Sequence, residues 1–175
     1  MLRIIFSLLL IAFIPASAYS LPNENIYSNS NIDIDVQTVD KHINVLKFTD
    51  YFIDHSFLFN IDDIKNINQN NWAKNENTSQ NFGQINAPIW FKFRLRNINK
   101  NAEQLYLALN YPHHDFVNIY YVDNKNIIKE IHTGDSLPFE TRENTEPNFI
   151  FPIPSSYSSL EVYISIRSEG LLKIP

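Results

Sequence analysis

The chain has 175 residues, with 14 basic and 19 acidic side chains, a formal net charge of -5 and no cysteine. An acidic chain without a dense Lys/Arg cluster is a poor binder of phosphate backbones, so nucleic acid is excluded as the partner. The lack of cysteine excludes disulfides, a thiol nucleophile and thiolate ligands for zinc, so stability must come from a buried core.

The first 18 residues have the pattern of a cleavable export signal. Arg3 precedes an apolar run from Ile4 to Ile14, and the small residues Ala16 and Ala18 follow that run. The run is about 11 residues long, whereas a membrane-spanning helix needs about 20. We therefore predict cleavage after Ala18 and a mature protein in the periplasm or another extracytoplasmic compartment. An uncleaved anchor is the alternative.

Residues 19–40 are polar and rich in Asn and Ser, which predicts a linker or a loosely held arm. Apolar and acidic residues alternate over residues 32–36, so a first edge strand could begin inside the arm. Further along, Tyr51–Ile53 could be strand or turn. Asn60 is a good helix cap, and acids follow it, so one helical turn could begin at Ile61.

From residue 87 onward, apolar and polar side chains alternate with a period of two, which is typical of half-buried β-strands. Turn-forming residues separate these segments, and helical periodicity is almost lacking. The pattern predicts an all-β domain over residues 41–175, an antiparallel β-sandwich of jelly-roll type. The expected strands are Ile89–Arg96, Leu105–Tyr111, Phe116–Tyr121 and Leu160–Arg167, with weaker candidates at Ile127–Ile131 and Phe149–Ile153.

Gly83, Gly134 and Gly170 are the three glycines of the chain. We predict that each is a structural turn residue, with a positive φ or a close chain approach that a side chain would block. Gly134 precedes Asp135 and no helical segment follows, which indicates a tight turn and not a phosphate-binding loop.

His113, His114 and Asp115 form the one cluster that suggests metal chemistry. Adjacent residues on a strand point to opposite sides, so one ion is poorly held by both histidines. A solvated turn after Pro112 is the preferred interpretation, and no metal or other cofactor is expected. Sequence motifs for catalysis are lacking, so we predict that the domain is not an enzyme. A secreted hydrolase using this cluster is the alternative.

If the alternating apolar residues face the core, the opposite sides of the strands carry aromatic, cationic and amide groups. Aromatic rings stack on sugars, and a guanidinium matches a carboxylate, so this side is a candidate ligand site. In the alternative interpretation, the N-terminal arm covers Trp90 and Tyr106 and makes them a second small core. The candidate ligand-binding residues are Trp90, Arg94, Tyr106, Tyr163 and Arg167.

An ordered set of motifs resembles one known family over about residues 45–175. The set is Trp72, Asn81–Gly83, Pro88–Asn97, Leu107–Pro112, Asp115–Tyr120, Gly134–Phe139 with Arg142, Phe149–Ile153, Val162–Ile164 and Ser168–Gly170. It is similar to the second-class extracellular domain of bacterial seven-transmembrane receptors with diverse intracellular signalling modules.

The resemblance implies a periplasmic jelly-roll sensor domain, similar in outline to carbohydrate-binding modules. In relatives, a seven-helix membrane region and a diguanylate cyclase, phosphodiesterase or histidine kinase output follow. No further apolar run of membrane length occurs before Pro175, so we expect the membrane-embedded region in relatives but not in this chain.

The resulting hypothesis is a non-enzymatic, periplasmic ligand-sensing domain of a bacterial signal-transduction receptor. We expect it to bind a carbohydrate-like or carboxylate small molecule. The alternative is a free soluble periplasmic carbohydrate-binding protein without a signalling output.

Overall fold

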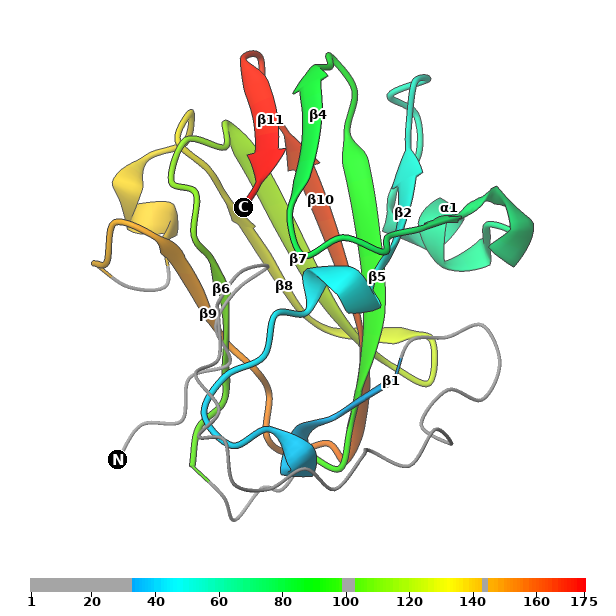
Figure 1. Cartoon of the computed structure of the whole chain (residues 1–175), viewed down its shortest axis with the longest axis vertical. Helices are drawn as coiled ribbons and strands as arrows, with labels where there is room; N and C mark the ends of the chain where they lie inside the picture. The colour runs from blue at the N-terminus through cyan, green and yellow to red at the C-terminus, as the bar shows by residue number, and fades with distance from the viewer. Residues whose placement is uncertain (1–32, 99–102, 143–144) are drawn as a thin grey trace.

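The computed structural model describes residues 33–98, 103–142 and 145–175 (Figure 1). The expected export signal and most of the polar arm lie outside these residues. The described part consists mainly of short strands with one α-helix, α1 (Ile61–Asn66). The strands are β1 (Asp33–Asp35), β2 (Asp50–Ile53), β3 (Ala73–Lys74), β4 (Gln80–Gln84), β5 (Ile89–Arg96), β6 (Tyr106–Leu109), β7 (Phe116–Asp123), β8 (Asn126–Thr133), β9 (Phe149–Pro152), β10 (Ser159–Arg167) and β11 (Leu171–Ile174).

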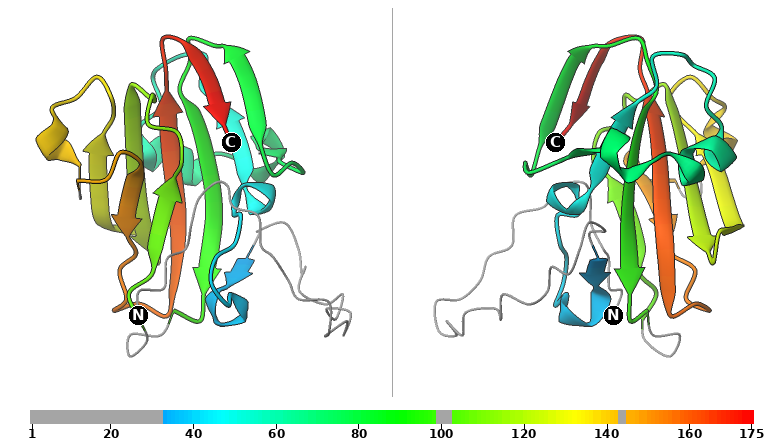
Figure 2. Two further views of the ribbon diagram at one scale, coloured as in Figure 1. Left: turned by 60° about the vertical axis from the view of Figure 1, so that its left-hand side comes forward. Right: turned by 90° about the vertical axis from the view of Figure 1, so that its right-hand side faces the viewer.

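The strands form two layers around one main core. The larger layer is a seven-stranded sheet in the order β3-β2-β5-β10-β7-β8, with β1 also paired to β5. Two small sheets, β11–β4 and β6–β9, pack against it from the opposite side (Figure 2). The prediction of an all-β antiparallel sandwich is confirmed. The β1–β5 pair is the parallel one among the described strands.

The period-two alternation sets the buried face of the central strands. Ile89, Phe91, Phe93 and Leu95 of β5 are at most 4% exposed and belong to the main core. Alternate residues of β7 and β10, from Val117 and from Leu160 onward, pack beside them. The small sheets close the core from the other side with Leu107, Leu109, Phe149, Phe151, Leu172 and Ile174.

Strand register fixes which side chains meet on the other face of the seven-stranded sheet, here named the outer face. β10 pairs antiparallel with β5 on one side and with β7 on the other. Side chains directly opposite in an antiparallel pair share one face. Across the outer face, Ser165 therefore lies beside Trp90, Tyr163 beside Lys92, and Glu161 beside Arg94.

The segments before β5 fold more tightly than the polar composition suggests. The expected first strand is present as β1, and Ile34 and Val36 are buried in the main core, so residues 33–38 belong to the packed domain. The expected helical turn is α1. Its capping box consists of the Asn60 side chain, which accepts from the Asp63 amide, and the Asp63 carboxylate, which accepts from the Asn60 amide.

The glycines differ from one another. Gly83 has a φ of +69° and Gly134 a φ of +148°. A Cβ at Gly134 would lie 2.1 Å from the Asp115 carbonyl oxygen, so the β8 turn requires glycine there. Gly170 has neither a positive φ nor an atom within 4 Å of an added Cβ, so the expected need for glycine does not arise at this position.

Candidate functional site

A second hydrophobic cluster, the outer cluster, covers part of the outer face. α1 contributes Ile61 and Ile64, and the chain that follows contributes Trp72. Trp90 is 4% exposed beneath this cover, and its ring stacks on Tyr120 with centroids 5.9 Å apart. The remaining buried members are Val122 and Tyr163.

Trp90 therefore lies in a second small core, as one of the two interpretations of the sequence proposed. Among the described residues, α1 and Trp72 form this cover, whereas the sequence suggests the N-terminal arm, most of which lies outside them. The short helix is held by its two isoleucines, which alternate with charged residues on the solvent side.

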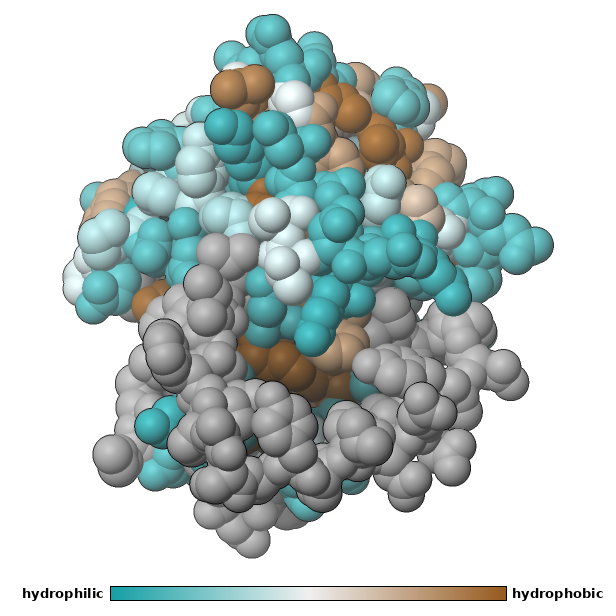
Figure 3. Space-filling view, in the orientation of Figure 1, coloured by the Kyte–Doolittle hydropathy of each residue, from teal (hydrophilic) through white to brown (hydrophobic). Residues whose placement is uncertain are grey.

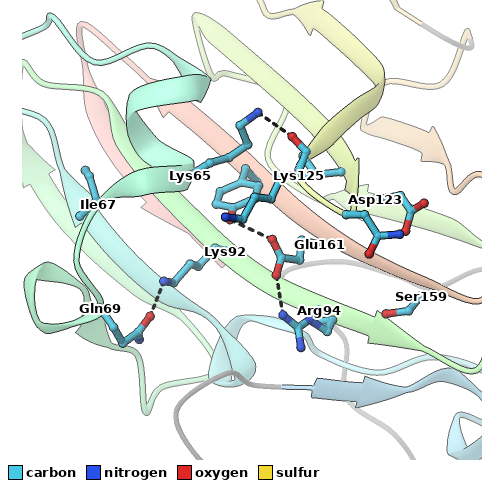
Figure 4. Close-up of a pocket in the computed structure, with 12 residues that line it drawn as sticks. Lys65, Ile67, Gln69, Lys92, Arg94, Asp123, Lys125, Ser159 and Glu161 are labelled. Atoms are coloured by element: carbon cyan, nitrogen blue, oxygen red, sulfur yellow. Dashed lines mark hydrogen bonds and ion pairs between the residues drawn. The ribbon is translucent and has the colours of Figure 1, made fainter.

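An open pocket of about 490 Å³ lies beside the outer cluster (Figure 4). It is bounded by β5 and β10, by the chain after α1, and by the turn between β7 and β8. Its lining residues are Lys65, Ile67, Gln69, Lys92, Arg94, Val122, Asp123, Asn124, Lys125, Ser159, Glu161 and Tyr163.

Lys92 lies between the pocket and the outer cluster. Its Nζ donates to Gln69 Oε1 at 2.5 Å and lies 4.1 Å from the centroid of the Trp72 ring. Gln69 Nε2 donates in turn to Asp50 Oδ2 at 2.6 Å, so the amide links the ammonium to a carboxylate that is 2% exposed. Burial lowers the pKa of Lys92, and the charges of Asp50 and Glu161 oppose that shift.

Arg94 and Tyr163 are both bound to Glu161. Arg94 Nη2 donates to Glu161 Oε1 at 2.5 Å, and the Tyr163 hydroxyl donates to Glu161 Oε2 at 3.1 Å. The hydrogen bond to Glu161 raises the pKa of Arg94, and burial raises the pKa of Tyr163. The pocket wall therefore presents a fixed guanidinium and a neutral phenol.

The rim adds further charge. Lys65 Nζ donates to the Lys125 carbonyl oxygen at 2.9 Å and pairs with Asp62 at 2.7 Å, which joins α1 to the β7–β8 turn. Lys125 has a φ of 70°, and together with Asn124 it lines the pocket. Four cationic side chains and two carboxylates line the pocket, and three further carboxylates, Asp33, Asp50 and Asp62, act on these cations from outside the lining.

The structure brings together two of the five candidate ligand-binding residues. Arg94 and Tyr163 line the pocket, whereas Trp90 lies beneath the outer cluster. Arg167 lies further along β10, beside a smaller pocket of about 190 Å³, with its guanidinium 4.2 Å from the centroid of Phe116. Tyr106 is on β6 in the small sheet with β9, so it does not share a face with the others.

Other lining residues were not among the candidates. Lys92 and Glu161 alternate on the same strands as Arg94 and Tyr163, so the period of two could have identified them. Gln69 comes from a polar segment without periodicity, and Lys125 from a turn. No sequence pattern places those two beside β5.

The His113–Asp115 segment is a packed corner. His114 is fully buried, with Nδ1 3.3 Å from Ser168 Oγ, and burial lowers its pKa to about 4. Asp115 accepts from the Glu169 amide at 2.7 Å. The interpretation as a solvated turn is therefore wrong for His114, although His113 is exposed. Within the described ranges, no three His, Asp or Glu side chains are grouped to hold a metal ion.

The fold is that of a two-layered all-β domain with a polar pocket on one outer face. The family described as 7TMR-DISM extracellular 2 matches residues 47–175, and the chain belongs to this family. It is thus an extracellular sensor domain of the receptor type, which places it outside the cytoplasm. A comparison with curated proteins finds no match to this chain. Over the residues described here, no helix has the length and apolarity to cross a membrane.

Proposed function

We propose that this domain senses a small molecule carrying a carboxylate and that the pocket between β5, β10 and the β7–β8 turn is the binding site. It works in the periplasm and binds its ligand without altering it chemically. The observation that carries the proposal is that two cationic side chains of β5, Lys92 and Arg94, line the same pocket and are held in place by hydrogen bonds.

The geometry of the wall supports an anionic group over a neutral one. The Arg94 guanidinium is already held in place by Glu161, and it can present its remaining N–H groups to a ligand in a fixed plane. Lys92 is partly desolvated, and Gln69 bridges it to Asp50, whose charge also acts on the ammonium. A ligand carboxylate near Lys92 would stabilise the charged ammonium against the cost of its burial.

A neutral carbohydrate has weaker support at this site. Sugar recognition commonly uses an open aromatic face, and Trp90 is covered by the outer cluster. Tyr163 offers its hydroxyl side to the pocket, bound to Glu161. A sugar acid, which combines hydroxyl groups with a carboxylate, fits both the phenol and the cations.

A thermal-shift screen of small carboxylates against their amides tests the proposal. A ligand at about 100 times its dissociation constant adds roughly 2.7 kcal/mol to the free energy of unfolding. We expect carboxylates to raise the melting temperature and the matched amides to have little effect. Equal shifts for acids and amides would contradict an anion site.

Two arginines on β5 provide a matched pair for the follow-up. Arg94 lines the pocket, whereas Arg96 is exposed and pairs with Asp33 at 3.3 Å, outside the lining residues. Arg94→Gln should lower the affinity for the carboxylate found in the screen by about 10- to 100-fold, as expected for the loss of a hydrogen bond to a charged group. Arg96→Gln should change its affinity less than about twofold. Equal losses would mean that general charge attraction, and not this pocket, carries the binding.

A further inference from the structure

The loop between β2 and α1, here named the Phe57–Phe59 loop, is an exposed apolar protrusion. Phe57 is 45% exposed, Leu58 80% and Phe59 40%. Isolated apolar residues are common on protein surfaces, but three large ones in succession mark an interaction site. Hydrophobic residues are visible along the upper edge of the face in Figure 3, the end at which this loop and the β10–β11 turn lie in Figure 1.

A buried carboxylate fixes the loop. Asp54 is 1% exposed, and its Oδ1 accepts from the Ser56 and Phe57 amides, both at 3.0 Å. Its Oδ2 accepts from the Phe59 amide at 3.1 Å. The Leu58 amide donates to the Ser56 hydroxyl at 3.2 Å. The backbone donors of the protruding segment are therefore satisfied inside the loop, and it can enter an apolar phase without leaving N–H groups unpaired.

Phe57 has a backbone conformation that a phenylalanine rarely adopts. Its φ is 60°, in the left-handed region that glycine and asparagine adopt far more readily than aromatic residues. Phe59 packs edge-on against Phe52 with centroids 5.6 Å apart, which ties the loop to the outer face. Leu58 and Phe57 are left to project. Because they are largely exposed, these two side chains add little to the stability of the fold, which suggests that they contact something outside the molecule.

We propose that the Phe57–Phe59 loop inserts into the interfacial region of a lipid bilayer. The family to which the chain belongs consists of extracellular domains of seven-transmembrane receptors, so a bilayer is the apolar phase that such a domain meets. The protruding shape suits a fluid surface, and phenylalanine and leucine are the residues that anchor interfacial segments. The neighbouring acids of α1 are engaged, Asp62 by Lys65 and Asp63 by the Asn60 amide.

The position of the loop is compatible with ligand binding. The loop follows Ile53, which pairs with Ile89 at one end of β5, whereas Arg94 lies toward the other end of that strand. Insertion of the loop therefore leaves the pocket between β10 and the β7–β8 turn open to solvent.

The lack of cysteine allows a site-specific test. A Leu58→Cys variant of the exported chain, labelled with an environment-sensitive fluorophore, is mixed with vesicles of phosphatidylcholine. This lipid is zwitterionic and has no net charge, so its surface does not attract the cationic side chains of the pocket through a net negative charge. The matched control is Phe139→Cys, since Phe139 is 53% exposed on a separate loop. Both variants have the same N-terminus, so any contribution of that part of the chain is the same in the two.

We expect lipid to blue-shift the Leu58 label and raise its emission about twofold or more, and to leave the Phe139 label unchanged. Phe57→Asn should weaken vesicle binding several-fold while keeping or raising the melting temperature, because asparagine tolerates a positive φ. If the emission of the Leu58 label does not change when vesicles are added, the proposal is overturned. A shift that grows with protein concentration without lipid would also overturn it, in favour of contact between two copies of the chain.

Discussion

The main core and the outer cluster are built from opposite faces of the same strands, yet they differ in kind. The main core joins two layers of strands through aliphatic and phenylalanine side chains and Tyr121, which alternate along β5, β7 and β10. The outer cluster is mostly aromatic and is closed by the six-residue helix α1 and by Trp72. One is held by strands from distant parts of the chain, the other by a short local cover. The first should therefore dominate stability, and the second should respond to changes in the pocket beside it.

Phe91→Ala gives the largest expected loss. Phe91 is fully buried in the main core, and its truncation should lower the free energy of unfolding by about 3 to 5 kcal/mol through lost burial and a residual cavity. Denaturant unfolding followed by far-UV circular dichroism measures this loss. Phe139→Ala, at an exposed position, should change the value by less than about 0.5 kcal/mol. Similar losses in the two variants would refute the assignment of the core face.

Acid should destabilise the protein through His114, which lies in neither cluster. Burial lowers its pKa from 6.5 to about 4, with Asp115 and His113 as the neighbouring charges. Between those two values the unfolded chain binds more protons, so stability is full above about pH 6.5 and falls as the pH drops toward 4, by roughly 3 kcal/mol in total.

Urea unfolding at a series of pH values checks this slope. His114→Asn removes the titrating group and should flatten the profile over the same range. If the variant keeps the full slope, the dependence arises from carboxylates and not from His114.

Trp90→Ala sharpens the comparison, because Trp90 lies directly across β5 from the main core. We expect the free energy of unfolding to fall by about 2 to 3 kcal/mol, less than for Phe91→Ala, because α1 and Trp72 can shift to fill part of the cavity. Trp90→Phe should cost less than about 1.5 kcal/mol, because the indole Nε1 has no hydrogen-bond partner among the described residues. A loss for Trp90→Ala near zero would mean that the ring is accessible, as the stacking hypothesis requires.

Lys92→Met gives the smallest expected effect. The methionine keeps the apolar stem but removes the contact with Trp72 and the hydrogen bond to Gln69, for a loss of about 1 kcal/mol. Lys173→Met, at an exposed position on β11, should lie within about 0.5 kcal/mol of the wild type. Chemical denaturation of the two variants side by side makes the comparison. If Lys92→Met leaves the free energy of unfolding unchanged, solvent screens both contacts.

Alternation predicted the main core well and the site only partly. Alternation with a period of two shows which residues of a strand share a face. It predicts that Arg94, Tyr163 and Trp90 lie together on the side away from Phe91. It does not state which sheet a strand joins, so Tyr106 was grouped with residues from which the sandwich separates it.

The alternation also does not predict which segment of the chain covers a given face of the sheet. The segment from Asn60 to Trp72 has few apolar residues, and its path over Trp90 depends on tertiary contacts of Ile61, Ile64 and Trp72. β4 and β11 also escaped notice. β4 is polar around Gly83, and β11 has four residues, too few for a clear period.

The two tryptophans of the chain, Trp72 and Trp90, both lie in the outer cluster, and the main core contains none. Intrinsic tryptophan fluorescence is therefore a selective optical reporter of one face of the molecule. Because Lys92 lies against the Trp72 ring, occupancy of the pocket should alter the emission without any added label. A titration that changes the fluorescence but not the far-UV spectrum would follow ligand binding in the unmodified protein.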